Sequence, residues 1–125
     1  MIIRDNDINL PATGSGSIAA ISIPSDTAKL KILNLLIDGG YIVGDGYGII
    51  ADLDATAGMV TIQNVRMECP NTTSDIIYIY NANSACYDLT IKNNTIKGTN
   101  AAYGQRAIVT KSARNSVIEQ NKQNL

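Results

Sequence analysis

The sequence predicts an all-β solenoid, in which the chain winds through about four coils of about 29 residues each. Two series of isoleucines support this prediction. The first is Ile21, Ile50, Ile79 and Ile108, and the second is Ile3, Ile32, Ile62, Ile91 and Ile118. Self-similarity at a fixed interval of roughly 20–50 residues is the sequence mark of stacked structural repeats. The interval is also far too long to be the period of one helix or one hairpin.

Two further positions follow the second isoleucine series at constant offsets. A small polar residue stands two places after each isoleucine: Asp5, Asn34, Asn64, Asn93 and Gln120. Three residues further on comes an apolar side chain, until the last member is polar: Ile8, Ile37, Met67, Ile96 and Gln123. The same short motif is therefore expected at the same place in every coil.

Each coil is expected to contain three short strands, as the stretch 60–80 shows. Val60, Ile62 and then Met67 alternate with polar residues, the period-two pattern of a strand with one buried face. Asn64 interrupts this alternation as a tight bend, residues 68–75 form a loop, and Ile77 and Ile79 point inward along a third strand. The coil before it is predicted from Leu30 to Ile50 and the coil after it from Leu89 to Ile108.

Equivalent residues in neighbouring coils are expected to stack at about 4.8 Å, the spacing of adjacent strands. Stacked isoleucines fill a narrow interior, which suits a chain with no Phe and no Trp. Stacked Asn34, Asn64 and Asn93 at the bend are interpreted as a structural ladder, because amides can bond one another and the unpaired backbone groups of the turn.

Composition excludes several classes of function. The net charge is −1, so the basic stripe of a nucleic-acid-binding protein is missing. Apolar runs are short and broken, and membrane insertion is not expected. There is no histidine, and Cys69 and Cys86 do not share the repeat interval, so we expect buried thiols rather than a disulfide or a metal site. No cofactor is predicted.

The repeated motif resembles the right-handed parallel β-helix of the pectate-lyase-like superfamily, which includes phage tailspikes and many polysaccharide lyases and hydrolases. The motif is Ile-x-Asn-x-x-Ile, seen at 32–37 and 91–96, with Met67 closing it at 62–67. The resemblance extends from Ile3 to Asn121. It implies polysaccharide as a partner, a homotrimer, and a place on a virion tail or at the cell surface. Leucine-rich repeats and β-propellers fit the period or the composition less well.

The whole chain, residues 1–125, is expected to be one β-helical segment of a longer protein. Ile3, Asp5 and Ile8 already occupy repeat positions, and Gln123 falls in an apolar one. Solenoids usually protect their first and last coils with atypical capping segments.

Tyrosines are the main candidates for ligand binding, because exposed phenol rings offer an apolar face and a polar edge to a sugar. They fall on the variable loops or on the strand that follows: Tyr47, Tyr78, Tyr80 and Tyr103. A protein–protein interface is an alternative reading of the same residues, since tyrosine is enriched there. Ordinary surface tyrosines are the third.

A catalytic reading would need two carboxylates across a glycosidic bond. Asp52 and Asp75 are weak candidates, because aspartates are common in turns for backbone reasons alone. The calcium-binding carboxylate cluster of pectate lyases and the histidine of the polygalacturonase branch are both missing from the sequence. We therefore expect a tailspike-like segment that recognises bacterial polysaccharide, with an enzyme fragment or a purely structural rod as alternatives.

Overall fold

The fold is that of a computed structural model of the chain. It describes residues 1–10, 19–23, 34–44, 46–52, 58–69, 75–80, 87–98, 106–110 and 113–124. Within these ranges, the side chains of Asp52, Tyr80, Tyr87, Arg114 and Asn124 are left undescribed. The described residues contain β-strands and no helix, and so no helix able to span a membrane.

In the part of the chain that the structure describes, fourteen strands form three parallel sheets, here called sheets A, B and C. Sheet A contains β1 (Ile2–Arg4), β4 (Asn34–Asp38), β7 (Met59–Gln63), β10 (Tyr87–Lys92) and β13 (Ala113–Glu119). Sheet B contains β2 (Asp7–Asn9), β5 (Tyr41–Val43), β8 (Arg66–Cys69), β11 (Thr95–Gly98) and β14 (Lys122–Asn124). Sheet C contains β3 (Ala19–Ile23), β6 (Tyr47–Asp52), β9 (Ile77–Tyr80) and β12 (Ile108–Thr110).

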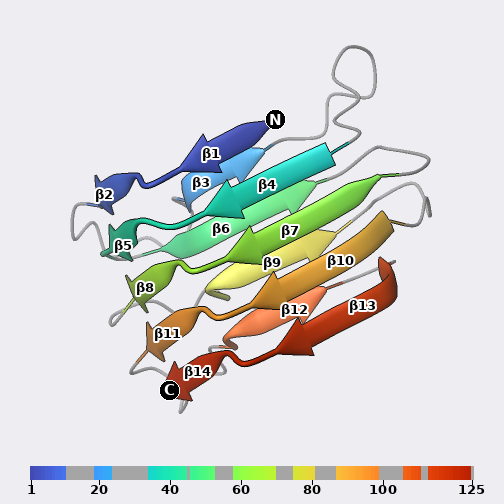
Figure 1. Cartoon of the computed structure of the whole chain (residues 1–125). Helices are drawn as coiled ribbons and strands as arrows, with labels where there is room; N and C mark the ends of the chain where they lie inside the picture. Colours follow the sequence, from blue (N-terminus) through green and yellow to red (C-terminus); the bar gives the residue numbers. More distant parts are fainter. Residues whose placement is uncertain are drawn as a thin grey trace.

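The chain visits sheets A, B and C in turn and then returns to sheet A one strand further along (Figure 1). Every neighbouring pair of strands is parallel, for example β4 with β7 and β7 with β10. Parallel pairing of each strand with the strand three elements later in sequence is the topology of a solenoid. The all-β prediction is confirmed, and the stacked parallel sheets are consistent with a parallel β-helix.

The core consists of stacked aliphatic side chains between the three sheets. Ile37, Ile62 and Ile91 of sheet A are in register and are at most 1% exposed. A parallel stack in sheet B passes through Ile42, Met67 and Ile96, also in register and buried. Like residues thus repeat at the strand spacing, which is the packing that the isoleucine series predicts.

A residue in the left-handed backbone conformation marks the corner between sheets A and B. It recurs in every passage from A to B, with φ between 50° and 75°, at Asp5, Gly39, Asn64, Asn93 and Gln120. Asparagine, aspartate and glycine adopt this conformation at the lowest cost. At Gly39 a Cβ would also run into the carboxylate of Asp5. The tight bend predicted at Asn64 is confirmed.

The prediction is wrong for one passage, at residues 32–37. Asn34 is the first residue of β4, opposite Met59, and does not lie at the bend. Ile37 pairs with Ile3 and Ile62 in sheet A, whereas Ile42 takes the sheet B position that we assigned to Ile37. Ile32 lies outside the described residues. The error arises because glycine, not asparagine, makes this bend.

The register of sheet C also differs from the first isoleucine series. Ile21 is opposite Ile49, which is opposite Ile77, which is opposite Ile108. Steps of 28, 28 and 31 residues thus replace three steps of 29. Ile50 is half-buried and pairs with Tyr78 on the outer face. The three steps add up to the same total as three steps of 29 residues. Ile21 and Ile108 are therefore equivalent in both alignments, whereas Ile50 and Ile79 are not.

Candidate functional site

Two tyrosines from neighbouring strands of sheet C lie beside each other. Tyr47 begins β6 and Tyr78 lies within β9, and their ring centroids are 6.2 Å apart with the ring planes tilted by 34°. Favourable aromatic pairs have this separation and an offset or tilted geometry. Tyr78 is half-buried between the fully buried Ile77 and Ile79, so its outward direction agrees with the predicted alternation.

An arginine–carboxylate pair lies next to these rings. The Arg106 guanidinium donates from Nε to Asp75 Oδ1 at 2.8 Å and from a terminal nitrogen to Asp75 Oδ2 at 2.9 Å. Such two-pronged pairs fix the plane of the guanidinium group. Asp75 is 7% exposed, whereas the Arg106 side chain is 64% exposed. The buried carboxylate therefore holds an accessible cation in a fixed orientation.

The tyrosines lie close enough to Arg106 to contribute to the rise in its pKa. The hydrogen bond to Asp75 is the main cause that raises the pKa of Arg106, followed by the Asp75 charge and by smaller contributions from Tyr78 and Tyr47. We call Tyr47, Tyr78, Asp75 and Arg106 the tyrosine–arginine cluster. It draws its members from three successive strands or strand approaches of sheet C, before β12, at β9 and at β6.

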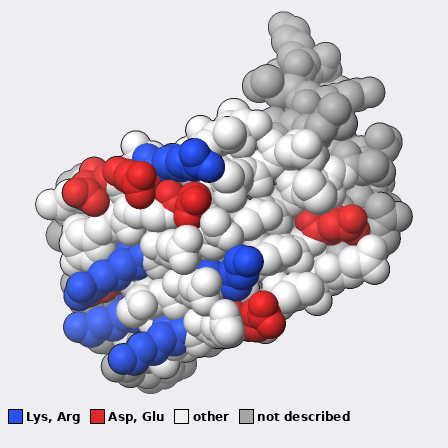
Figure 2. All heavy atoms as spheres, viewed as in Figure 1, with Lys and Arg blue, Asp and Glu red and all other residues white. Residues whose placement is uncertain are grey.

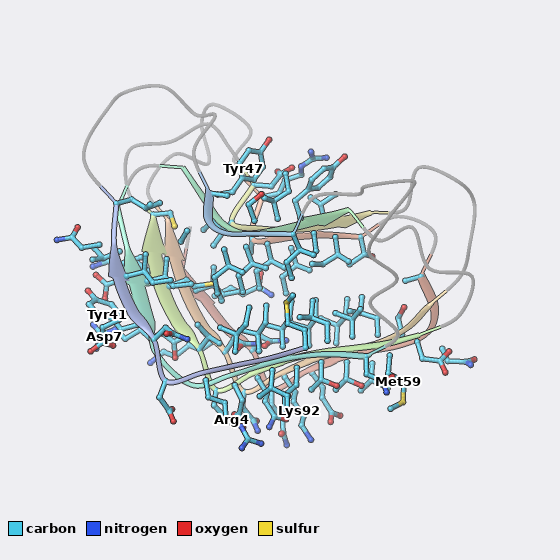
Figure 3. All side chains as sticks on the ribbon, turned by 90° about the horizontal axis from the view of Figure 1, so that it is seen from above. Arg4, Asp7, Tyr41, Tyr47, Met59 and Lys92 are labelled. Atoms are coloured by element: carbon cyan, nitrogen blue, oxygen red, sulfur yellow. The ribbon has the colours of Figure 1, made fainter. Side chains whose placement is uncertain are left out.

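This cluster faces away from sheet A. In the view down the stack, Tyr47 projects from the side of the molecule opposite to Arg4, Met59 and Lys92 (Figure 3). Aromatic faces, phenol hydroxyls and guanidinium N–H groups are the groups that contact the C–H faces and hydroxyls of sugars. The arrangement can therefore bind a polar ligand that also has apolar surface.

The other predicted site residues are only partly described. Tyr80 ends β9 opposite Asp52, which ends β6, and neither side chain is described. Tyr103 lies outside the described residues. In the backbone register, Asp52 lies opposite Tyr80, and the neighbouring position is shared by Ile23, Ala51, Ile79 and Thr110.

The structure does not test the predicted catalytic pair, Asp52 and Asp75, because the Asp52 side chain is not described. Both carboxylate oxygens of Asp75 accept hydrogen bonds from Arg106, which gives this residue a structural explanation. The distance to the Asp52 carboxylate is not defined, so a two-carboxylate mechanism stays a prediction. Among the described side chains, no three or more His, Cys, Asp or Glu residues gather as a metal site would require.

A second polar cluster lies on the outer face of sheet B. Arg66 donates from Nε to Glu68 Oε1 at 2.9 Å, and its guanidinium carbon is 5.2 Å from the Tyr41 ring centroid. The bond to Arg66 is the main reason why the pKa of Glu68 is lowered, and the charge of Lys97 adds to this effect. This cluster was missed by the sequence reasoning, although Tyr41 and Arg66 both stand one residue before an inward-facing position.

Asparagine side chains connect successive bends between sheets A and B. Asn94 and Asn121, each one residue after the left-handed bend, form an amide ladder. The predicted ladder of Asn34, Asn64 and Asn93 stays a prediction. Asn64 donates its side-chain amide to Asp38 Oδ1 at 2.8 Å on the protein surface. Cys69 is buried, as expected, and Cys86 lies outside the described residues.

Comparisons with protein-family models, with curated proteins and with solved structures find no match for this chain. A function for the chain is therefore inferred from the geometry of the fold and of the tyrosine–arginine cluster.

Proposed function

We propose that this chain is a segment of a right-handed parallel β-helix of about four coils, similar to phage tailspikes, and that it recognises bacterial polysaccharide. Right-handed crossovers are found in about 98% of connections between parallel strands of one sheet, which supports this handedness. The three stacked parallel sheets support the solenoid. A place on a virion tail or at a cell surface belongs to the same proposal.

The observation that carries the proposal is the tyrosine–arginine cluster. Tyr47 and Tyr78 place two phenol rings 6.2 Å apart on neighbouring strands, and Arg106 lies beside them with its orientation fixed by Asp75. Rings fixed on a sheet lose little conformational freedom when a ligand binds, which lowers the cost of binding. The guanidinium adds directional donors for sugar hydroxyls or for the carboxylate of an acidic sugar.

The cluster extends along the direction in which strands stack. A bound oligosaccharide would therefore run along the stack and cross successive strands of sheet C, about 4.8 Å for each strand. A hexose in an extended chain has a comparable length. Such a shallow site binds weakly, near millimolar, and gains strength when several copies act together in an oligomer.

The experiment is a titration of tri- to hexasaccharides from a panel of bacterial polysaccharides, followed by calorimetry or by amide chemical shifts. Tyr47→Ala and Tyr78→Ala should each weaken binding by about tenfold or more, as loss of a stacked ring does. Tyr41→Ala is the matched control, because Tyr41 is an outer-face tyrosine on sheet B, away from the cluster.

Different outcomes separate the alternatives. Release of reducing sugar that depends on Asp52 or Asp75 would show an enzyme. A protein that folds but binds none of the glycans would fit a structural rod, and so would equal binding by wild type and by the Tyr47→Ala, Tyr78→Ala double variant.

A further inference from the structure

The outer face of sheet A carries a column of aliphatic and threonine side chains, here called the apolar column, with no covering element among the described residues. The column takes one residue from each strand, in register: Ile2, Leu36, Thr61, Thr90 and Val117. Ile2 is 66% exposed and Val117 is 44% exposed, and Met59 beside the column is 57% exposed. A groove of about 380 Å³ lies between Ile2, Leu36 and Met59.

A second column runs beside the first, where the strands of sheet A end. It also takes one residue from each strand in register: Arg4, Asp38, Gln63, Lys92 and Glu119. The signs along it are positive, negative, neutral, positive and negative. Figure 3 shows Arg4 and Lys92 on the outer side of this sheet, and Figure 2 shows charged side chains near the strand ends with a largely uncharged surface beside them.

This order of charges is complementary to itself when it is reversed. Read backwards, the column places Glu119 against Arg4, Lys92 against Asp38, and Gln63 against Gln63. Reversal of the apolar column places Val117 against Ile2, Thr90 against Leu36, and Thr61 against itself. A surface that matches its own reverse is the requirement for contact around a two-fold axis, since both partners then use the same patch.

We propose that the outer face of sheet A binds a second copy of this chain, around a two-fold axis that runs along β7. In this pair the two sheets pack face to face, about 10 Å apart, with the order of their strands opposed. Asp38 of each copy faces Lys92 of the other, and Arg4 faces Glu119. An axis along the stack, as in the trimer that the resemblance implies, keeps equivalent strands level and does not bring these pairs together.

The charged groups can make such contacts in addition to those within the chain, since a carboxylate accepts several hydrogen bonds and Asp38 accepts one from Asn64. The pair within the chain, Arg4 with Asp38, is long at 3.9 Å, and the Arg4 side chain is 58% exposed. Five strands about 4.8 Å apart and about five residues long cover roughly 400 Å². This is about half of the roughly 800 Å² that each partner of a standard interface buries, so we expect a dimer weaker than roughly 1 μM. It is also expected to weaken as salt screens the four charge pairs.

The test uses two charge-reversal variants, Asp38→Lys and Lys92→Asp. In the first variant the introduced lysine would face Lys92 of the other copy, and in the second the introduced aspartate would face Asp38 of the other copy. Each variant alone should therefore sediment as a monomer at concentrations where the wild type dimerises. An equimolar mixture should restore the dimer, because each variant then faces its complement. Mixing cannot change energies within a chain, and thermal melts of each variant confirm that both fold.

The proposal is overturned if the wild type sediments as a 13.3 kDa monomer up to about 1 mM, if it forms a trimer, or if the mixture is no more associated than its components. A Thr61→Lys variant gives an independent check, since this residue lies on the axis and would oppose its own copy. Thr95→Lys on sheet B is its control and should leave the dimer intact. Sheets A and C face opposite ways, so the dimer does not depend on the polysaccharide proposal.

Discussion

The side-chain amide of Asn94 donates to the side-chain oxygen of Asn121 at 3.0 Å, and this contact joins two successive bends of the chain. Asn94 also donates to the carbonyl of Ile62 at 3.1 Å and accepts from the backbone N–H of Val65 at 3.0 Å. Asn121 repeats the pattern one strand further along, with a bond to the Ile91 carbonyl at 2.9 Å. Amides at this position therefore pair the backbone groups that the bends leave without strand partners.

Asn94→Ala is expected to lower the free energy of unfolding by about 1–3 kcal/mol. Asn94 is 1% exposed, so its removal leaves the Val65 N–H and the Ile62 carbonyl without these partners in a buried place. Thr95→Ala, at the next and exposed position, is the control and should change stability little. Denaturant unfolding measures both. Equal stability of Asn94→Ala and wild type would mean that water replaces the amide.

The left-handed conformation at Asn64 predicts that valine and glycine substitutions there differ in their effect on stability. With φ at 59°, this residue is in the left-handed region, where a β-branched side chain costs about 1–2 kcal/mol and glycine costs little. Asn64→Val should therefore destabilise by that amount more than Asn64→Gly. Both variants lose the same surface hydrogen bond to Asp38, so the difference between them isolates the backbone. A valine variant as stable as the glycine variant would contradict this account of the corner.

The sequence was sufficient to predict the stacked isoleucines and most of the bends. At Asn64 and Asn93 the motif Ile-x-Asn-x-x-Ile and the structure agree. Asparagine defines the motif in the sequence, and it also adopts the left-handed backbone conformation at low cost. Gly39 adopts the same left-handed conformation, but it is a different residue type and so does not match the motif. A search for the conformation, rather than for asparagine, would have aligned Ile37-Asp-Gly39-Gly-Tyr-Ile42 with the other bends.

The candidate site was less predictable, for a physical reason. Alternation along β9 correctly placed Tyr78 between two inward isoleucines, since the period of a strand is local. The contact with Arg106 depends instead on the register between strands that are separated by loops of unequal length. The steps of 28, 28 and 31 residues in sheet C are not readable from composition. The sequence alone therefore does not predict that Arg106 lies beside the tyrosines.

Acid should destabilise the fold through two surface carboxylates. The pKa of Glu68 is lowered from its usual value of 4.5, mainly by its hydrogen bond to Arg66, and that of Asp38 from 3.8, mainly by Asn64. A carboxylate with a lowered pKa in the folded state stabilises that state above the unfolded pKa, and this contribution is lost as the pH falls through the folded value. The melting temperature should thus decrease as the pH falls below about 4.5.

The control for this acid effect is the double variant Glu68→Gln, Asp38→Asn, which cannot titrate at either position. It should show a smaller decrease in melting temperature between about pH 5 and about pH 3 than the wild type does. If both proteins lose the same amount, the acid sensitivity comes from other carboxylates, and the two lowered pKa values have no consequence for stability.

The length of oligosaccharide that the cluster accepts should follow from the spacing of the strands. Tyr47, Tyr78 and Arg106 come from three successive positions along the stack, so a ligand that touches all three must span about two strand spacings, roughly 10 Å. Affinity should therefore rise from monosaccharide to about trisaccharide and change little beyond it. Amide signals around Tyr47, Tyr78 and Arg106 should shift together with one saturation curve. Shifts confined to Thr61 and Thr90 would place the ligand on sheet A, and affinity that already levels off with a monosaccharide would mean that a single tyrosine, rather than the stacked group, makes the contact.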